Sequence, residues 1–206
     1  MKYIELYNLF KNKTVFSIQE IYIIEPNFDK RRISEWKKKG YIKSVSKGRY
    51  TFSEKTLGDE DYFIIANIIN QPSYISCESA LYYYNLIPEG VFMTTSITSK
   101  KTIDYQTDIG KFRYNKISAR LLFGFKLVNG INGKFKIAYK EKAILDFLYL
   151  KSQLKTEKDF LDLRIDSDEF FDGFDYSRRE LYLKQFNKKT LTQRAQLLFT
   201  TIQKNA

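Results

Sequence analysis

The sequence predicts an α+β fold built from two units. Helical spacing of apolar residues and a short β-type pattern fill the first 52 residues, and the polar stretch SEKTLGDED (53–61) follows. Beyond it, helical patterns frame a region between Val91 and Tyr139 that is rich in β-branched and aromatic residues. We therefore expect a small N-terminal domain at 1–55 and a larger mixed α/β domain at 60–206.

The N-terminal unit begins with two short helices. Residues 3–10 (YIELYNLF) have the apolar spacing of a short amphipathic helix. In FSIQEIYIIEP, Ser17 and Glu20 have the spacing of a capping box ahead of an isoleucine-rich helix. Pro26 ends this helix, because the residue before a proline avoids the helical conformation.

A third helix and a hairpin complete this unit. The segment NFDKRRISEWKKKG starts at Asn27 or Asp29 and stops at Gly40, a residue that favours helix C-termini. Residues 41–45 and 49–52 have the pattern of two strands joined by a turn. Two helices, a turn, a third helix and a hairpin follow one another in the order of a winged helix-turn-helix, which we predict for residues 1–55.

The larger unit combines helices with β-type segments. The β-type segments VFMTTSIT, KFRYNKI, GFKLV and GKFKIAY are separated by glycines. Ser76 is the expected N-cap of a helix that follows a turn at Pro72. The remaining helices are expected at 62–70, 140–152, 156–164, 177–187 and 190–203.

The positive charge of the chain is concentrated around the third helix. Nine Lys or Arg residues and two acidic residues lie between Asp29 and Arg49, a local net charge of +7 in a chain of net +11. Clustered Lys and Arg neutralise phosphates and release counterions, so this region predicts a polyanionic partner, namely double-stranded DNA.

A helical wheel divides the third helix into two faces. Ile33 and Trp36 fall together and would pack on the first two helices, while basic and polar side chains cover the opposite side. Side chains early on such a helix typically reach base edges, and later ones meet phosphates. The candidates for base contacts are Arg31, Ser34 and Lys38. The candidates for phosphate contacts are Lys30, Lys37, Lys39, Lys47 and Arg49.

The composition disfavours catalysis. The chain has no histidine, which removes the usual general base and imidazole metal ligands, and Cys77 stands alone. We expect no cofactor and no bound metal. An alternative is a metal-dependent nuclease or other DNA-modifying enzyme using Asp166 and Asp168, although their surroundings fail the calcium-loop pattern. A third possibility is an interaction module whose basic region meets an acidic protein.

No segment suggests a membrane partner. No run of residues approaches the ~18 apolar residues of a membrane span. The N-terminus MKYIELYNLFKNK is too interrupted by polar residues for a signal peptide. We therefore expect a cytoplasmic protein.

The second unit resembles a known family. PSYISCESALYYYNLIPEG, TTSITSKKT, TDIGKFRYNKI, LLFGF and YKEKAILDFLYL occur in this order. Together they resemble the AbiEi-type antitoxins and transcriptional regulators of type IV toxin–antitoxin and abortive-infection loci. The resemblance implies an autorepressor that binds inverted repeats in its own promoter. It also implies that the second unit counteracts a nucleotidyltransferase-like toxin, directly or indirectly.

Overall fold

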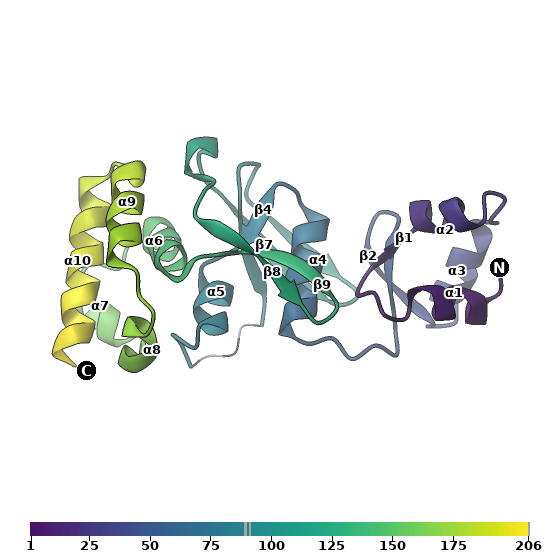
Figure 1. Ribbon diagram of the computed structural model, residues 1–206, viewed down its shortest axis with the longest axis horizontal. Helices are drawn as coiled ribbons and strands as arrows, with labels where there is room; N and C mark the ends of the chain where they lie inside the picture. Colours follow the sequence, from purple (N-terminus) through teal and green to yellow (C-terminus); the bar gives the residue numbers. More distant parts are fainter. Residues whose placement is uncertain (89, 91, 206) are drawn as a thin grey trace.

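The computed structural model describes residues 1–88, 90 and 92–205. The molecule is elongated, with its termini at opposite ends of the long axis (Figure 1). A small helical part with its own sheet forms the N-terminal end, a larger sheet lies in the middle, and a group of helices forms the C-terminal end. The protein is thus a mixed α+β structure, as the sequence predicts.

Three helices and a three-stranded sheet make up the N-terminal end. The sheet has the antiparallel order β1-β3-β2. Ser17 caps the second helix and Glu20 completes the capping box, as predicted. The elements are α1 (Tyr3–Phe10), β1 (Phe16–Ser17), α2 (Ile18–Ile24), α3 (Arg31–Lys38), β2 (Ile42–Ser46) and β3 (Arg49–Phe52).

The central sheet has six strands in the order β6-β7-β5-β4-β9-β8. Its β4–β9 and β5–β7 pairs are parallel and the other three are antiparallel. The strands are β4 (Ser73–Ile75), β5 (Thr94–Thr98), β6 (Ile103–Thr107), β7 (Gly110–Lys116), β8 (Phe125–Gly130) and β9 (Gly133–Ala138). A short 3-10 helix (Ala119–Leu121) separates β7 from β8.

Three helices pack on this sheet. They are α4 (Asp59–Ile69), α5 (Glu78–Tyr83) and α6 (Lys140–Leu150). Helix α4 lies against β4, β5 and β9, and the Tyr114 hydroxyl on β7 donates a hydrogen bond of 2.6 Å to its Ala66 carbonyl. Helix α6 is buried from Glu141 to Leu148, because it lies between the sheet and the C-terminal helices.

Four helices form the C-terminal end. Helix α10 packs along α6 and α7. Its apolar residues are spaced for one buried face, which includes Leu191, Ala195 and Leu198. The four helices are α7 (Glu157–Leu161), α8 (Ser167–Phe171), α9 (Tyr176–Phe186) and α10 (Lys189–Lys204).

A lysine and an aspartate are completely buried where α6 meets β4. Lys142 forms an ion pair with Asp146 one turn along α6, and both side chains are fully inaccessible. The Tyr74 and Ser76 hydroxyls each donate a hydrogen bond of 2.9 Å to Asp146. Burial raises the pKa of the Asp146 carboxyl, while Lys142 and the two hydroxyls act in the opposite direction.

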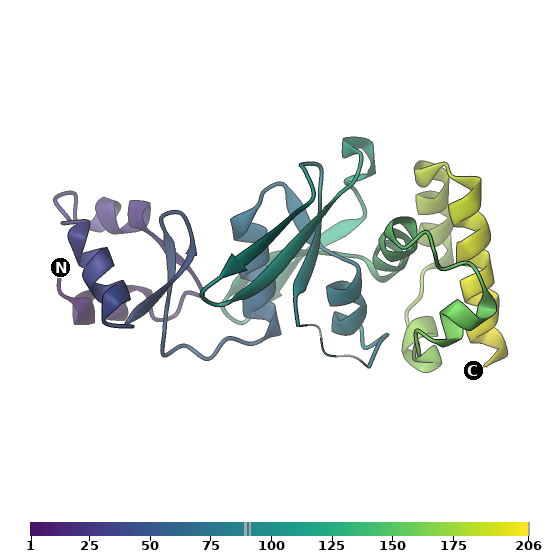
Figure 2. The same ribbon diagram turned by 180° about the vertical axis from the view of Figure 1, so that it is seen from behind.

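Polar contacts join the N-terminal end to the central sheet. The buried Asp61 carboxylate on α4 accepts hydrogen bonds from the Thr14 hydroxyl and, at 3.1 Å, from the Asn132 amide in the β8–β9 turn. The Ser44 amide on β2 donates to the carboxylate of Asp108 in the β6–β7 turn (3.2 Å). Figure 2 shows this teal β6–β7 hairpin extending toward the N-terminal end.

Several boundaries differ from the sequence-based expectation. Helix α4 begins at Asp59, inside the stretch expected to be a linker, because its three acidic residues favour a helix N-terminus. Helix α5 is capped at Cys77 rather than Ser76, whose hydroxyl instead binds Asp146. Strands β1, β4 and β6 and helix α8 were not expected. Among the described residues no helix is both long and apolar enough to cross a membrane.

The buried ion pair generates a stability prediction. Asp146→Ala should reduce the free energy of unfolding by about 3–5 kcal/mol, because it leaves the Lys142 ammonium buried without a counter-charge. Urea unfolding followed by circular dichroism measures this loss. The double variant Lys142→Met/Asp146→Leu removes both charges and should lose much less stability. Equal losses in the single and double variants would contradict this explanation.

A candidate nucleic-acid interface

Helix α3 is attached to its unit by its apolar face. Ile33 and Trp36 are each 4% exposed, which confirms the predicted apolar face of the wheel. The Trp36 ring contacts Tyr3 at 6.0 Å and Phe28 at 5.8 Å between centroids. These aromatic contacts fix the rotation of α3, because turning the helix would expose the indole to water.

The opposite face of α3 carries the predicted basic and polar residues. Arg31, Ser34, Lys37 and Lys38 are exposed, as are Lys30 at the N-cap and Lys39 at the C-cap. The helix starts at Arg31, later than Asn27 or Asp29. Gly40 follows the C-cap with a φ of +72°, a left-handed conformation that glycine adopts without steric cost.

Arg31 is held by a neighbouring acid. Its guanidinium Nε lies 3.1 and 3.0 Å from the two carboxylate oxygens of Asp29, and Nη2 lies 3.0 Å from Oδ2. This hydrogen bonding lowers the pKa of Asp29 and raises that of Arg31. The Arg31 side chain is nevertheless 89% exposed, so its remaining N–H groups face solvent.

The lysines near the end of α3 are placed differently from Arg31. Lys37 and Lys38 lie in the last turn, where positive charge interacts favourably with the negative end of the helix dipole. Within the part of the chain that the structure describes, Lys37, Lys38 and Lys39 form none of the ion pairs. Their charges are therefore available to phosphates.

The β2–β3 hairpin, whose strand β2 contacts α3, carries two further cations at its turn. Lys47 and Arg49 flank its tight turn and are exposed. Gly48 in this turn has a φ of +73°, and a Cβ there would approach Ile18 to 3.3 Å. The rest of the hairpin is held from two sides, because Phe16 pairs with Tyr50 and Val45 is buried in the core of the larger unit.

Two exposed basic residues were missed by the sequence reasoning. Arg32 lies on α3 beside Arg31, and Lys43 projects from β2. The helical wheel assigned no role to Arg32. Lys43 follows Ile42 in β2, and because Ile42 is buried, the next residue of the strand faces outward. Both add positive charge to the predicted set.

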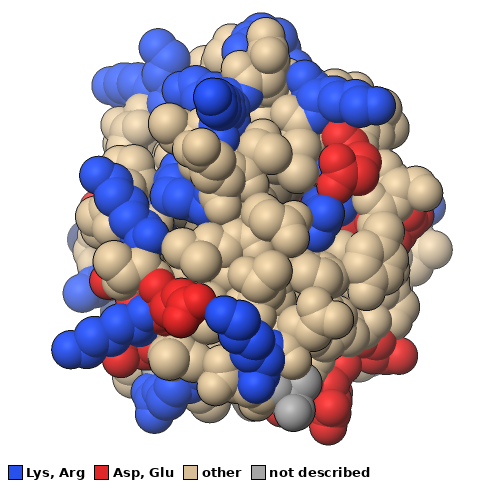
Figure 3. Space-filling view, turned by 90° about the vertical axis from the view of Figure 1, so that its left-hand side faces the viewer, with Lys and Arg blue, Asp and Glu red and all other residues tan. Residues whose placement is uncertain are grey.

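Positive charge also occurs at the other end of the molecule. Figure 3 shows the C-terminal end, where Lys and Arg side chains surround a largely uncharged area, with Asp and Glu between them. The exposed cations of α9, α10 and the loop before α10 include Lys184, Lys188, Lys189 and Lys204. Overall charge alone therefore does not locate the interface.

The acidic residues proposed for a nuclease have structural roles. Asp166 caps α8 by accepting from the Glu169 amide at 2.9 Å, and Asp175 caps α9 in the same way through Arg178. Asp168 lies in the first turn of α8, where a negative charge is favourable. No group of three or more acidic or cysteine side chains able to hold a metal occurs in residues 1–88, 90 and 92–205.

The ion pair of Arg31 generates a prediction for DNA binding. Asp29→Asn should tighten binding to any duplex DNA by about three- to ten-fold at low salt, because it removes a negative charge from the interface and frees the guanidinium. Fluorescence anisotropy with a labelled duplex measures the affinity. Asp162→Asn makes the same change in net charge at the C-terminal end and should have little effect. Equal effects of the two variants would mean that α3 is not the binding surface.

No family model matches the chain. No curated protein matches it either. We therefore infer the function from the exposed face of α3, the β2–β3 hairpin and the resemblance of the second unit.

Proposed function

We propose that the chain is a sequence-specific, double-stranded DNA-binding protein with an N-terminal winged helix-turn-helix. The observation that carries this proposal is the division of α3, with Ile33 and Trp36 buried and Arg31, Arg32, Ser34 and Lys38 exposed. A recognition helix needs an apolar face for its own domain and a basic face for the major groove. The hairpin with Lys47 and Arg49 is the wing.

The DNA contacts divide by position on the helix. Arg31, Ser34 and Lys38 lie on the side of α3 opposite the buried Ile33 and Trp36, so these side chains are assigned to the groove. Lys30, Lys37, Lys39, Lys47 and Arg49 are assigned to phosphates, since exposed lysines and arginines around a recognition helix neutralise the DNA backbone. Releasing Arg31 from Asp29 is then part of binding.

The biological role follows from the resemblance of the second unit. An AbiEi-type protein represses its own promoter through inverted repeats and counteracts a nucleotidyltransferase-like toxin. We propose both roles for this chain, which would act in the cytoplasm as an antitoxin and not as an enzyme. The two units have distinct hydrophobic clusters, which supports one role for each unit: DNA binding for the first and antagonism of the toxin for the second.

Sequence specificity is tested by two variants of α3. Arg31→Ala should weaken binding to the upstream promoter region roughly 5- to 150-fold, because a base contact is lost, and should change affinity for random DNA much less. Lys39→Ala should weaken binding to both DNAs alike and reduce the slope of log K against log salt by about one. A mobility-shift assay at several salt concentrations distinguishes them. Equal affinity of the unmodified chain for promoter and random DNA would refute operator specificity.

The antitoxin role is tested separately from DNA binding. Co-expression with a nucleotidyltransferase-like protein encoded beside this gene should restore growth that the toxin alone arrests. The Arg31→Ala variant should restore growth equally well while failing to repress a promoter–reporter fusion, because its second unit is unchanged. If the unmodified chain gives no protection, the antitoxin proposal fails, whatever the result with DNA.

A further inference from the structure

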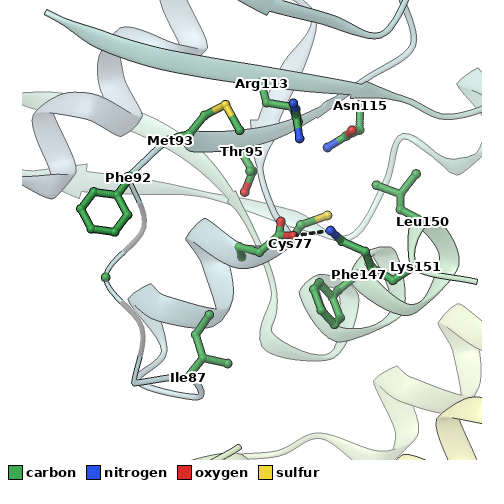
Figure 4. A pocket seen from close by; sticks show the side chains of 12 residues that line it. Cys77, Ile87, Phe92, Met93, Thr95, Arg113, Asn115, Phe147, Leu150 and Lys151 are labelled. Atoms are coloured by element: carbon green, nitrogen blue, oxygen red, sulfur yellow. Dashed lines mark ion pairs between the residues drawn. The ribbon is translucent and has the colours of Figure 1, made fainter. Parts of the chain in front are cut away.

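The second unit contains a cavity of about 480 Å³ that the proposed DNA-binding surface does not use. It lies between strands β5 and β7, the start of α5 and the end of α6. This volume is in the range of sites that hold small organic molecules. Figure 4 shows Arg113 and Asn115 projecting toward it from one side, with Phe147 and Lys151 on the opposite side.

The sheet supplies one polar wall. Arg113 and Asn115 are two residues apart on β7 and therefore face the same side of the sheet, and Thr95 on β5 is the register partner of Arg113. The alternating residues Phe112 and Tyr114 face the other side and are buried in the core. Arg113 and Asn115 thus bring hydrogen-bonding groups to the cavity. The Thr95 hydroxyl is already used, because it donates to the Ser76 carbonyl at 2.8 Å and accepts from the Ser79 amide at 3.0 Å.

The Arg113 guanidinium is oriented before any ligand arrives. The Asp104 carboxylate on the edge strand β6 accepts from its Nε at 2.9 Å and from its Nη2 at 2.7 Å. This fork-to-fork pair uses two of the five guanidinium N–H groups and leaves the others free. The Asn115 side-chain amide makes no hydrogen bond with another described residue.

The opposite wall combines charge with apolar surface. Lys151, at the C-cap of α6, forms an ion pair of 3.0 Å with Glu78 on α5. Phe147 and Leu150 line the cavity beside them. Each cation is paired with one carboxylate, Arg113 with Asp104 and Lys151 with Glu78, so these four groups carry no net charge. They offer a ligand the N–H groups that the two pairs leave unused.

We propose that this cavity binds a small organic carboxylate with an apolar or aromatic body. The free N–H groups of Arg113 and the Asn115 amide donate to the carboxylate, because planar donors of this kind match its two oxygens. The body of the ligand lies against Phe147 and Leu150. This is a binding site in the second unit, separate from the DNA interface on α3.

Calorimetric titration of the full chain near pH 7 and at low salt tests the proposal. The probes are benzoate, 3-phenylpropionate and indole-3-acetate, with 3-phenylpropanamide as the uncharged counterpart. At least one carboxylate should bind saturably with one-to-one stoichiometry, and the amide should bind ten-fold more weakly or worse. Arg113→Gln should weaken carboxylate binding by ten-fold or more, whereas Lys116→Gln, with the same charge change on β7 outside the cavity, should leave it unchanged.

A second readout does not depend on a variant, because Arg113→Gln also breaks the ion pair with Asp104 and affects folding. In the unmodified chain, the bound carboxylate should shift the backbone amide resonances of Thr95, Arg113 and Asn115 and leave those of α3 in place. Three results would overturn the proposal. They are no saturable binding of any of the three carboxylates, equal affinity for the amide, or shifts confined to residues outside the cavity.

Discussion

The buried ion pair of Lys142 and Asp146 constrains the packing of the whole second unit. Neither charge reaches water, so each depends on partners in fixed positions. The hydroxyls of Tyr74 and Ser76 bring β4 to the carboxylate, and the rings of Phe123 and Phe186 lie 4.8 Å from the ammonium. Helix α6 therefore cannot slide or rotate without breaking contacts to the sheet and to α9 at once. This fixes both the C-terminal helices and the α6 wall of the cavity.

A second buried carboxylate, that of Asp61, orients the two units. Its partners are the Thr14 hydroxyl of the N-terminal end and the Asn132 amide of the central sheet. Since Val45 of the hairpin also belongs to the core of the larger unit, the hairpin is shared between both. The surface of α3 is thus presented by a scaffold that extends well beyond the first 55 residues, although the two hydrophobic clusters remain distinct.

The basic residues of α3 include exposed lysines and an arginine that is paired with a neighbouring acid. In the proposed DNA complex the exposed lysines meet phosphates, but Arg31, one of the three candidates for a base contact, already binds Asp29. Exposed ion pairs of this kind contribute little to stability, so exchanging the carboxylate for a base edge costs little. Asp29, which precedes α3, and Glu35 on α3 also lower the local positive charge. In the proposed complex this reduces binding to DNA in general relative to a specific site.

The sequence by itself determined the features that depend on residues a few positions apart. They include the capping box of Ser17 and Glu20, the end of α3 shortly before Gly40, and the buried pair Ile33 and Trp36. These were predictable because helical geometry relates near neighbours in the chain. Only the tertiary structure decided the rest. The pairing of Phe16 with Tyr50, the hydrogen bond between Thr14 and Asp61, and the cavity formed by residues from 77 to 151 join distant segments. Long-range contacts of this kind depend on how the sheet and helices pack together, and no local pattern of residues encodes that.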